Sequence, residues 1–338
     1  MRNYFFTLLL SFSSLFCAAQ LQRFSFTQPK MGSPFTIIFY TRDSMHAQVT
    51  AQNCFKLADS LINILSDYID SSELNRLCAR AGNSGNSFIC SPTLYDILLQ
   101  SKFAYEKSLG SFDITLGPVT RLWRKARKEK IFPQQDSVKE KLALTGFTKI
   151  QIDTVTHAAY LLQAGMQLDL GGIGQGYIAQ QVMNYLKTQQ IENTLIDVSG
   201  DIVCSGTPPG TKGWTVAINV PESDNELLPR HLLIANKSVT TSGDVYQFME
   251  HDGKRYSHIV DPATGYGITS QKNVTVIADD GTTADWFTKA CSILPLTKAK
   301  KIAADLHAEF LIAEVKKGKL VYYKSKGFDK YWKGIIKN

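Results

Sequence analysis

Four glycines, at positions 171, 172, 174 and 176, directly follow an apolar run that ends at Leu170. A helix beginning there would offer unpaired backbone N–H groups and a partial positive charge to a phosphate, and glycine lets a ligand approach the backbone closely. Tight packing explains such a turn equally well. The spacing matches neither G-x-G-x-x-G nor a P-loop, so a usual dinucleotide-binding fold is disfavoured.

Two further segments carry hydroxyl, carboxylate and imidazole groups. Residues 240–244 read Thr-Thr-Ser-Gly-Asp, a combination that binds phosphate or caps a turn. His258 lies in the segment 257–265, Ser-His-Ile-Val-Asp-Pro-Ala-Thr-Gly. Because histidine titrates near neutral pH, it could take a proton from an attacking hydroxyl. The same segment also suits a plain turn at Pro262, so both interpretations stay open.

Hard oxygen donors occur near residue 285. Asp285 and Thr288 are three residues apart, which places them on one face of a helical turn. A carboxylate, a hydroxyl and nearby carbonyl oxygens suit Mg²⁺, which keeps open positions for phosphate oxygens. Helix capping by either side chain is the alternative.

The surrounding pattern favours an α+β fold with mixed or antiparallel sheets and flanking helices. An apolar run at 34–40 predicts a strand, and helical periodicity predicts helices at 47–65 and at 93–108. After residue 150, short strands are predicted to alternate with Gly-rich turns, with helices near 174–189 and 283–294, and a hairpin closes the chain. The predicted strands are 150–152, 159–162, 194–198, 214–220, 232–234, 273–278, 310–315 and 320–323.

The first nineteen residues predict a signal peptide. Arg2 precedes an apolar stretch, and Cys17-Ala18-Ala19 offers a cleavage site. Lipoprotein anchoring at Cys17 is disfavoured because the bulky Phe16 stands before it. We therefore expect an exported, periplasmic protein whose residues 20–338 form a single catalytic domain.

The composition limits the classes of partner. A net charge of +7 is modest. The densest basic cluster could meet phosphates, but a solvated helix face is the favoured interpretation. No aromatic-interleaved motif accompanies it, so no nucleic-acid partner is expected. The five cysteines after residue 19 match no zinc spacing and are expected to be buried free thiols. The basic cluster consists of Arg121, Arg124, Lys125, Arg127, Lys128 and Lys130.

Taken together and in order, these motifs resemble those of the FAD:protein FMN transferase (ApbE-like) family, from about Met31 to Leu294. The similarity implies the T-fold-like α+β architecture of that family. It is carried by Met-Gly-Ser at 31–33, Asp-Tyr-Ile-Asp-Ser-Ser-Glu-Leu-Asn at 67–75, Gly-Ser-Phe-Asp-Ile-Thr at 110–115 with Gly-Pro at 117–118 and Trp123, Asp-Leu-Gly-Gly-Ile at 169–173, Ser-Gly-Asp at 199–201, Thr-Ser-Gly-Asp at 241–244 and His-Ile-Val-Asp-Pro at 258–262.

The resemblance implies a reaction and a site. A Thr or Ser hydroxyl of an exported redox protein would attack the FMN-side phosphorus of FAD, and AMP would leave; any membrane association would be peripheral, through that acceptor. His258 is the candidate base and Asp244 a second one, while Mg²⁺ would be held by the Gly172 carbonyl, Asp285 and Thr288. The residues implied to contact FAD are Met31, Tyr68, Ser111, Phe112, Asp113, Asp169, Gln175 and Ile259.

The sequence departs from the family pattern at two positions. Gln175 stands where many members have Lys, and Lys289 stands where the family has a metal-binding Thr. A charged ammonium cannot ligate Mg²⁺. Thr288 could serve instead, or Lys289 could itself neutralise the diphosphate. Two other functions therefore stay open: an FAD pyrophosphatase that uses water, and a flavin-binding protein without turnover.

Overall fold

The computed structural model describes residues 20–83, 87–223, 226–243, 247–316 and 318–333; the predicted signal peptide lies outside them. Within these residues, eight strands form one antiparallel sheet in the order β1-β2-β6-β7-β10-β13-β14-β15. Their bounds are β1 Gln22–Lys30, β2 Ser33–Thr41, β6 Thr194–Val198, β7 Asp201–Ser205, β10 Ser238–Gly243, β13 Lys272–Ala278, β14 Glu309–Lys316 and β15 Lys319–Lys324.

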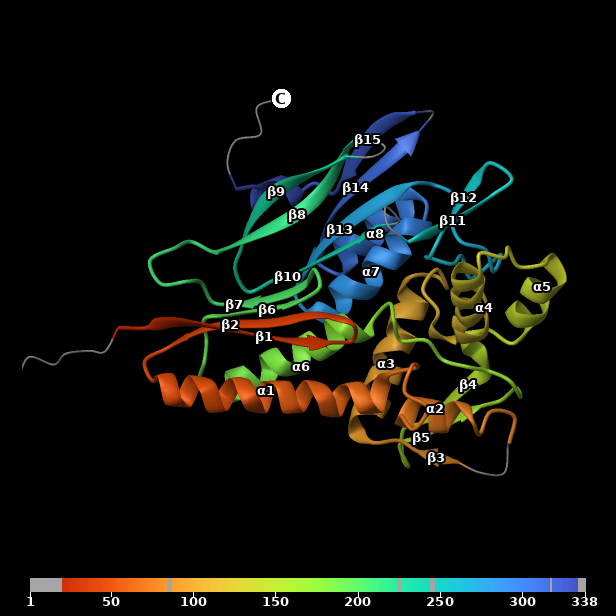
Figure 1. Cartoon of the computed structure of the whole chain (residues 1–338), viewed down its shortest axis with the longest axis horizontal. Coiled ribbons are helices and arrows are strands. Elements are labelled where there is room, and N and C mark those ends of the chain that lie inside the picture. The colour runs from red at the N-terminus through yellow and green to blue at the C-terminus, as the bar shows by residue number, and fades with distance from the viewer. Residues whose placement is uncertain (1–19, 84–86, 224–225, 244–246, 317, 334–338) are drawn as a thin grey trace, which may run out of the picture.

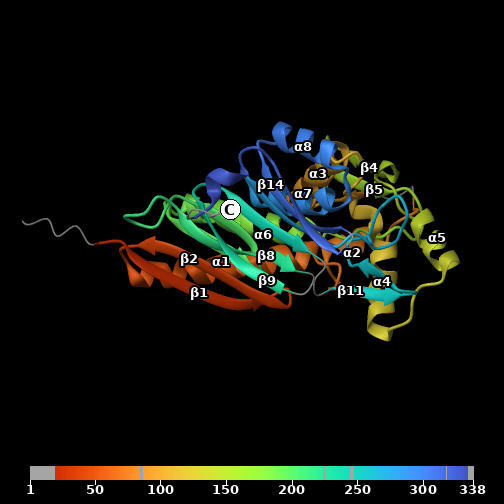
Figure 2. The same cartoon turned by 90° about the horizontal axis from the view of Figure 1, so that it is seen from above.

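Helices cover one face of this sheet and a β-hairpin packs on the other (Figures 1 and 2). Side chains of β2 and β6 alternate between the two faces because successive residues of a strand point to opposite sides. Ile37 and Ile196 join the helix-side core, whereas Ile38 and Leu195 pack on the hairpin side. The helices are α1 Ser44–Leu65, α6 Gly174–Thr188, α7 Gly281–Ile293 and α8 Leu296–Asp305, and the hairpin is β8 Trp214–Ser223 with β9 Glu226–Ile234.

A second group of elements lies beside the end of the sheet, where α4 and α5 stand apart from α1 in both views (Figures 1 and 2). It contains a three-stranded sheet in the order β3-β5-β4 and a separate hairpin, β11–β12. Its bounds are α2 Glu73–Cys78, β3 Phe88–Ile89, α3 Pro92–Lys107, η1 Ile114–Leu116, α4 Gly117–Glu129, α5 Gln135–Ala143, η2 Phe147–Lys149, β4 Ile150–Asp153, β5 Ala158–Leu161, β11 Phe248–His251 and β12 Lys254–Ser257, and a final turn, η3 Phe328–Tyr331, follows β15.

Local capping explains where the predicted helices begin. The Asp43 carboxylate accepts hydrogen bonds from the N–H groups of Met45 and His46, so α1 starts three residues before the predicted position 47. Ser91 caps α3 in the same way, and Pro92 occupies its first turn. Asp280 caps α7 through the N–H of Thr283.

The α+β fold predicted from the sequence is confirmed, with one local correction. Residues 240–243, read as a turn, belong to strand β10, where the Thr241 hydroxyl lies 2.9 Å from that of Thr275 on β13. Asp244 lies outside the described residues. The five described cysteines are free, four of them buried and Cys78 partly buried. In the described part of the chain, no helix is both long enough and apolar enough to cross a membrane.

Candidate active site

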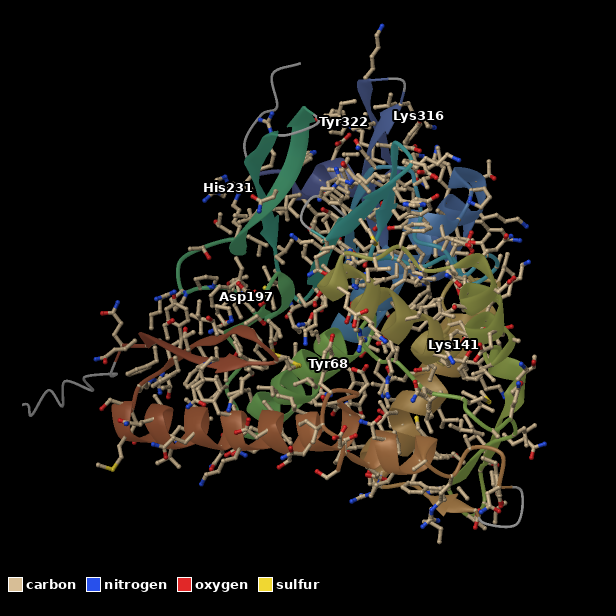
Figure 3. All side chains as sticks on the ribbon, turned by 45° about the vertical axis from the view of Figure 1, so that its right-hand side comes forward. Tyr68, Lys141, Asp197, His231, Lys316 and Tyr322 are labelled. Carbon is tan, nitrogen blue, oxygen red and sulfur yellow. The ribbon has the colours of Figure 1, made fainter. Side chains whose placement is uncertain are left out.

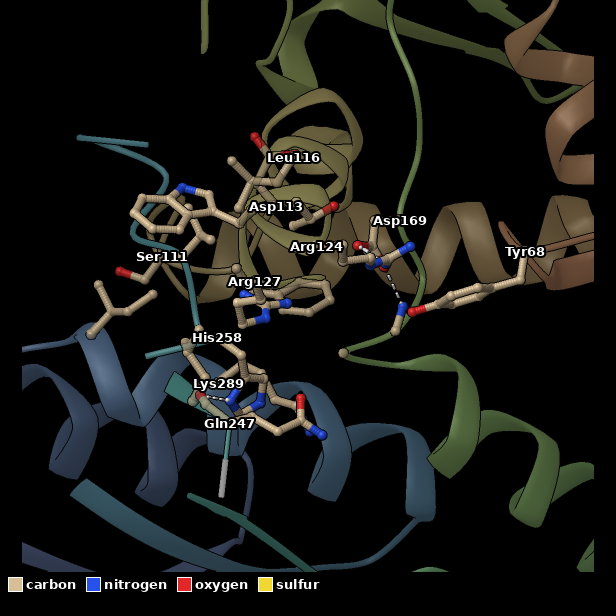
Figure 4. Close-up of a pocket in the computed structure, with 18 residues that line it drawn as sticks. Tyr68, Ser111, Asp113, Leu116, Arg124, Arg127, Asp169, Gln247, His258 and Lys289 are labelled. Carbon is tan, nitrogen blue, oxygen red and sulfur yellow. Dashed lines mark hydrogen bonds and ion pairs between the residues drawn. The ribbon is translucent and has the colours of Figure 1, made fainter. Parts of the chain in front are cut away.

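A cavity of ≈ 250 Å³ opens between α4, α7 and three of the motif-bearing turns (Figure 4). Figure 4 shows His258, Lys289 and Gln247 together on one side, across from Tyr68. The wall combines aromatic rings with three cationic side chains. Its residues are Tyr68, Ser111, Phe112, Asp113, Leu116, Thr120, Trp123, Arg124, Arg127, Asp169, Gly171, Gly172, Gln247, His258, Ile259, Val260, Lys289 and Ile293.

Hydrogen bonds tie the separate motif segments together around this cavity. Asp113 accepts from both the N–H and the hydroxyl of Thr115, at 2.8 and 2.7 Å, which fixes the turn that carries Ser111 and Phe112. Burial raises the pKa of the Asp113 carboxyl, although the bonds from Thr115 oppose this rise. The N–H of Asp169 donates to the carbonyl of Ile114 at 2.7 Å. Segments about fifty residues apart thus become one wall.

The segment that carries His258 is anchored to α4. The indole Nε1–H of Trp123, a buried ring on α4, donates to the carbonyl of Gly265 at 2.8 Å. Gly265 has a φ of +74° and its N–H donates to the carbonyl of Asp261, so the turn needs a residue that tolerates the left-handed region. These contacts therefore fix the position of the His258 segment relative to α4.

The glycine-rich turn serves packing as much as ligand approach. A Cβ on Gly176 would lie 2.1 Å from the carbonyl oxygen of Gly281, so only glycine lets α6 and α7 cross this closely. Several amides of the turn already have protein acceptors. The N–H of Gly171 donates to Asp169, that of Gly174 to the carbonyl of Leu170, and that of Gly176 to Asp285. These three amides are therefore not free to donate to a ligand in the observed arrangement.

Arg124 forms the centre of an ion-pair cluster at the cavity mouth. Its guanidinium donates to Asp67 and, at 2.6 Å, to Asp169. The ring of Tyr68 lies over the guanidinium, 4.5 Å from centroid to Cζ, a cation–π arrangement. Tyr68 is 76% exposed. It lies where the large sheet and its helices meet the second group of elements (Figure 3). The Tyr68 ring is therefore held in place and still accessible to a planar ligand.

The basic cluster on α4 is not simply a solvated face, as the sequence suggested. Arg121, Arg124 and Arg127 are three residues apart, which places them on one side of the helix, and the last two line the cavity. Burial lowers the pKa of Arg127, and the charge of Arg124 lowers it further. Within the described residues Arg127 has no carboxylate partner, so an anionic ligand would stabilise its charge.

His258 is held as a neutral imidazole. Burial, with the charge of Lys289 as a second cause, lowers its pKa to about 4. Its Nδ1 lies 3.2 Å from the carbonyl oxygen of Gln247, and a neutral ring that donates from Nδ1 leaves Nε2 as a proton acceptor. At neutral pH the ring is therefore uncharged and Nε2 can act as a proton acceptor, with the low basicity that a pKa of about 4 implies.

Two buried acids, Asp285 and Asp201, lie near Lys289, and Asp285 contacts it directly. The Lys289 ammonium donates to Asp285 Oδ1 at 2.5 Å, and Asp285 is fully buried. Asp201, at the start of β7, is also buried; desolvation and the charge of Asp285 raise its pKa to about 7, while Lys289 and the hydroxyl of Thr240 oppose this rise. The two acids in turn raise the pKa of Lys289 against the opposing effect of burial, so its ammonium stays charged.

These residues do not fit a bound Mg²⁺ in the observed arrangement. Both Asp285 oxygens are occupied, one by Lys289 and the other by the N–H of Gly176 at 3.0 Å. The Lys289 stem passes beside Gly172, where a Cβ would lie 3.4 Å from its Cγ. A divalent ion about 4 Å from the ammonium would meet a repulsion of about 8 kcal/mol, twice that of two unit charges in the protein environment. No group of three potential metal ligands of the His, Cys, Asp or Glu type occurs among the described residues.

The structure gathers most, not all, of the residues expected to contact a ligand. The cavity is lined by Tyr68, Ser111, Phe112, Asp113, Asp169, Gly172, His258 and Ile259.

Four others lie away from the cavity surface. Met31 sits in the β1–β2 turn and Gln175 in the first turn of α6. Asp285 lies beneath Lys289, and the Thr288 hydroxyl donates to the carbonyl of Asp285 at 2.7 Å inside α7. Asp244 is outside the described residues.

Sequence reasoning assigned no place in the site to three polar side chains of this wall, Arg124, Arg127 and Gln247, or to the buried Asp201 near it, although the arginines and Asp201 belonged to segments it had named. The three-residue spacing of the arginines was a usable signal for the first two. Gln247 carried none, because its role depends on the position of the loop before β11.

Comparison with known proteins agrees with this arrangement. The chain matches the ApbE family over residues 31–312. A relative from Klebsiella pneumoniae (strain 342), named FAD:protein FMN transferase, is 31% identical over 266 residues, covering 78% of this chain and 80% of that protein. A protein of the same name from Treponema pallidum (strain Nichols) is 29% identical over 296 residues, covering 83% and 81%.

Solved structures share the fold. The flavin transferase ApbE from Vibrio cholerae superposes with a TM-score of 0.83 at 24% identity, covering 92% of this chain and 100% of that one. The apo form of the Pseudomonas stutzeri flavinyl transferase ApbE gives a TM-score of 0.82 at 26% identity, covering 94% and 99%. The chain therefore belongs to the ApbE family.

Proposed function

We propose that this protein is an FAD:protein FMN transferase, an enzyme that moves FMN from FAD onto a Thr or Ser hydroxyl of another protein. Its relatives from Klebsiella pneumoniae and Treponema pallidum carry that name. The observation that carries the proposal is the cavity itself, which joins aromatic surface, three cationic side chains and one neutral imidazole.

The cavity suits the parts of a flavin dinucleotide. Phe112 and Tyr68 offer ring surface for a planar heterocycle. Arg127 and Lys289 supply positive charge for the diphosphate, and Arg127 has no competing carboxylate among the described residues. A volume of ≈ 250 Å³ holds only part of a dinucleotide. The remainder would extend over the open mouth, beside the exposed Tyr68.

The reaction is a phosphoryl-type transfer that balances without any other reagent. The acceptor oxygen forms a bond to the FMN-side phosphorus of FAD, the bond from that phosphorus to the bridging oxygen breaks, and AMP leaves with that oxygen. His258 accepts the proton of the attacking hydroxyl, which its neutral state permits. Cationic side chains stabilise the charge that develops on the phosphate oxygens. Dependence on Mg²⁺ is not part of this proposal, because the residues present do not fit that ion.

The proposed compartment rests on the predicted signal peptide, and the proposed partner rests on the resemblance of the motifs to the ApbE family. Residues 1–19 are proposed to direct export to the periplasm, and the acceptor is proposed to be an exported redox protein. Contact with a membrane would be peripheral, through that acceptor.

Incubation of residues 20–338 with FAD and the exported protein fraction of the source cells tests the proposal. A protein band that keeps flavin fluorescence in a denaturing gel, with release of one AMP per flavin attached, is the expected result. The His258→Asn variant should label the acceptor at least about 100-fold more slowly at matched concentration. AMP release without a labelled protein would mean that water is the acceptor, and tight binding of intact FAD without AMP would mean that the protein only binds flavin; either result refutes transfer.

A further inference from the structure

We propose that the ammonium of Lys289 takes the place of a divalent cation in this site, so that the protein binds FAD and transfers FMN without Mg²⁺. This inference rests on the proposed function and goes beyond it, because it assigns a catalytic contact to a side chain that points into the cavity from α7.

The first observation is the position of the charge. Lys289 lies four residues after Asp285 in α7, and its ammonium contacts that carboxylate at 2.5 Å. A fifth of the Lys289 side chain remains exposed, and the side chain lines the cavity. It therefore connects the buried acid with the space where a ligand would lie. A cation that bridges a protein carboxylate to a phosphate oxygen has the same two contacts.

The second observation is the shape of the floor. The Lys289 stem packs beside Gly172, whose missing side chain leaves room for it: a Cβ there would lie 3.4 Å from Lys289 Cγ and 3.1 Å from the ring of Phe112. The lysine is thus packed on one side by the glycine-rich turn and held at its tip by Asp285. Its ammonium is fixed before any ligand arrives, and a fixed charge needs little reorganisation when the reaction begins.

The third observation concerns Asp201, the second acid beneath the cavity. It lies buried within electrostatic range of both Lys289 and Asp285. Asp201 is partly protonated at neutral pH because its pKa is raised to about 7, so Asp285 is the main counter-ion of Lys289. Arg127, which also lines the cavity, has no carboxylate partner among the described residues, and its charge adds to that of Lys289 where a diphosphate would lie.

Equilibrium binding of FAD, measured by flavin fluorescence in EDTA and in excess Mg²⁺, tests the inference on residues 20–338. The wild type should bind with the same Kd in both buffers, within about twofold. Lys289→Thr should bind about tenfold or more weakly in EDTA, the effect of one charge-assisted hydrogen bond, and should regain affinity when Mg²⁺ is added. Mg²⁺ alone should raise the Tm of this variant and leave that of the wild type unchanged.

Two further variants serve as controls. Lys289→Arg keeps the charge and should remain independent of Mg²⁺, and it stays informative if Lys289→Thr fails to fold by circular dichroism. Lys298→Thr changes an exposed lysine on the neighbouring helix α8 and should behave as the wild type in every assay.

The possible outcomes distinguish failure of this inference from failure of the proposed transferase function. A wild type that binds or transfers only with Mg²⁺ would overturn the inference and leave the transferase proposal standing. A Lys289→Thr variant that binds FAD as the wild type does in EDTA would overturn it as well. A wild type that binds no FAD in either buffer would contradict the proposed function, and the inference with it.

Discussion

Replacement of Arg124 by methionine should destabilise the protein in a pH-dependent way. Arg124 lies between Asp67 and Asp169, whose side chains are only 6% and 11% exposed. Methionine keeps an apolar stem and removes the charge, its hydrogen bonds and its cation–π contact with Tyr68. Two nearly buried carboxylates would then lose their ion-pair partner, and Arg121 would be the remaining positive charge that lowers the pKa of Asp67.

The magnitude follows from the burial of the three groups. Removal of one partner from a fully buried ion pair costs about 3–5 kcal/mol. Because the Arg124 side chain is 25% exposed, water screens part of this interaction, and we expect a loss of about 2–3 kcal/mol in the free energy of unfolding at pH 7. Lys125→Met, on the next residue, removes a lysine that is 70% exposed and should cost less than about 0.5 kcal/mol.

The sign of the pH dependence comes from Asp67. Burial raises its pKa above 3.8, the charge of Asp169 raises it further, and Arg124 opposes both effects. When a carboxyl has a higher pKa in the folded state than in the unfolded state, the free energy of unfolding falls as pH rises from the unfolded-state pKa through the folded-state pKa. Because Arg124 lowers the pKa of Asp67, its removal would raise the pKa of Asp67 in the folded state further. The defect of Arg124→Met should therefore be small near pH 4 and grow toward pH 7.

Urea unfolding followed by circular dichroism at pH 4.5 and at pH 7 measures this difference. In the Arg124→Met background, Asp67→Asn should restore part of the stability at pH 7, because it removes one of the two unpaired charges. A loss below about 0.5 kcal/mol at pH 7 would refute the reasoning, and so would a loss that does not change with pH.

Three other changes test separate parts of the site. His258→Asn should slow FMN transfer by about 10²–10⁴-fold with little change in FAD affinity, and wild-type activity should fall only below pH 6 because its pKa is lowered to about 4; an acid limb at or above pH 6.5 would contradict this role. Tyr68→Ala should weaken FAD binding about threefold to tenfold in a fluorescence titration without lowering Tm, since the ring is exposed; unchanged affinity would place the flavin elsewhere. Gly176→Ala should lower the free energy of unfolding by about 1–3 kcal/mol, because its Cβ would clash with Gly281; a stable variant would mean that α6 can shift.

Much of the fold was predictable from local patterns. The apolar run of β2 and the Ser91-Pro92 start of α3 are signals contained in a few consecutive residues. Strand β10 was not recognised because hydroxyl side chains occupy several of its positions. Its Thr241 pairs with Thr275 of β13, a partner that only the folded sheet provides.

The site shows the same division between local and distant information. The order of the motifs was sufficient to predict that Phe112, Asp169 and His258 face one cavity. The role of Arg124 was not predictable, because its partners Asp67 and Asp169 lie 57 and 45 residues away along the chain. The sequence showed that Lys289 stands where the family has a metal-binding Thr. The structure adds that its ammonium contacts Asp285, the expected metal ligand.

Intact-mass spectrometry of the labelled acceptor tests the central claim most directly. After incubation with FAD and this protein, the acceptor should gain the mass of one FMN minus one water, and fragmentation should place it on a single Thr or Ser side chain. An acceptor of unchanged mass, alongside FAD that has been hydrolysed or merely bound, would contradict the account.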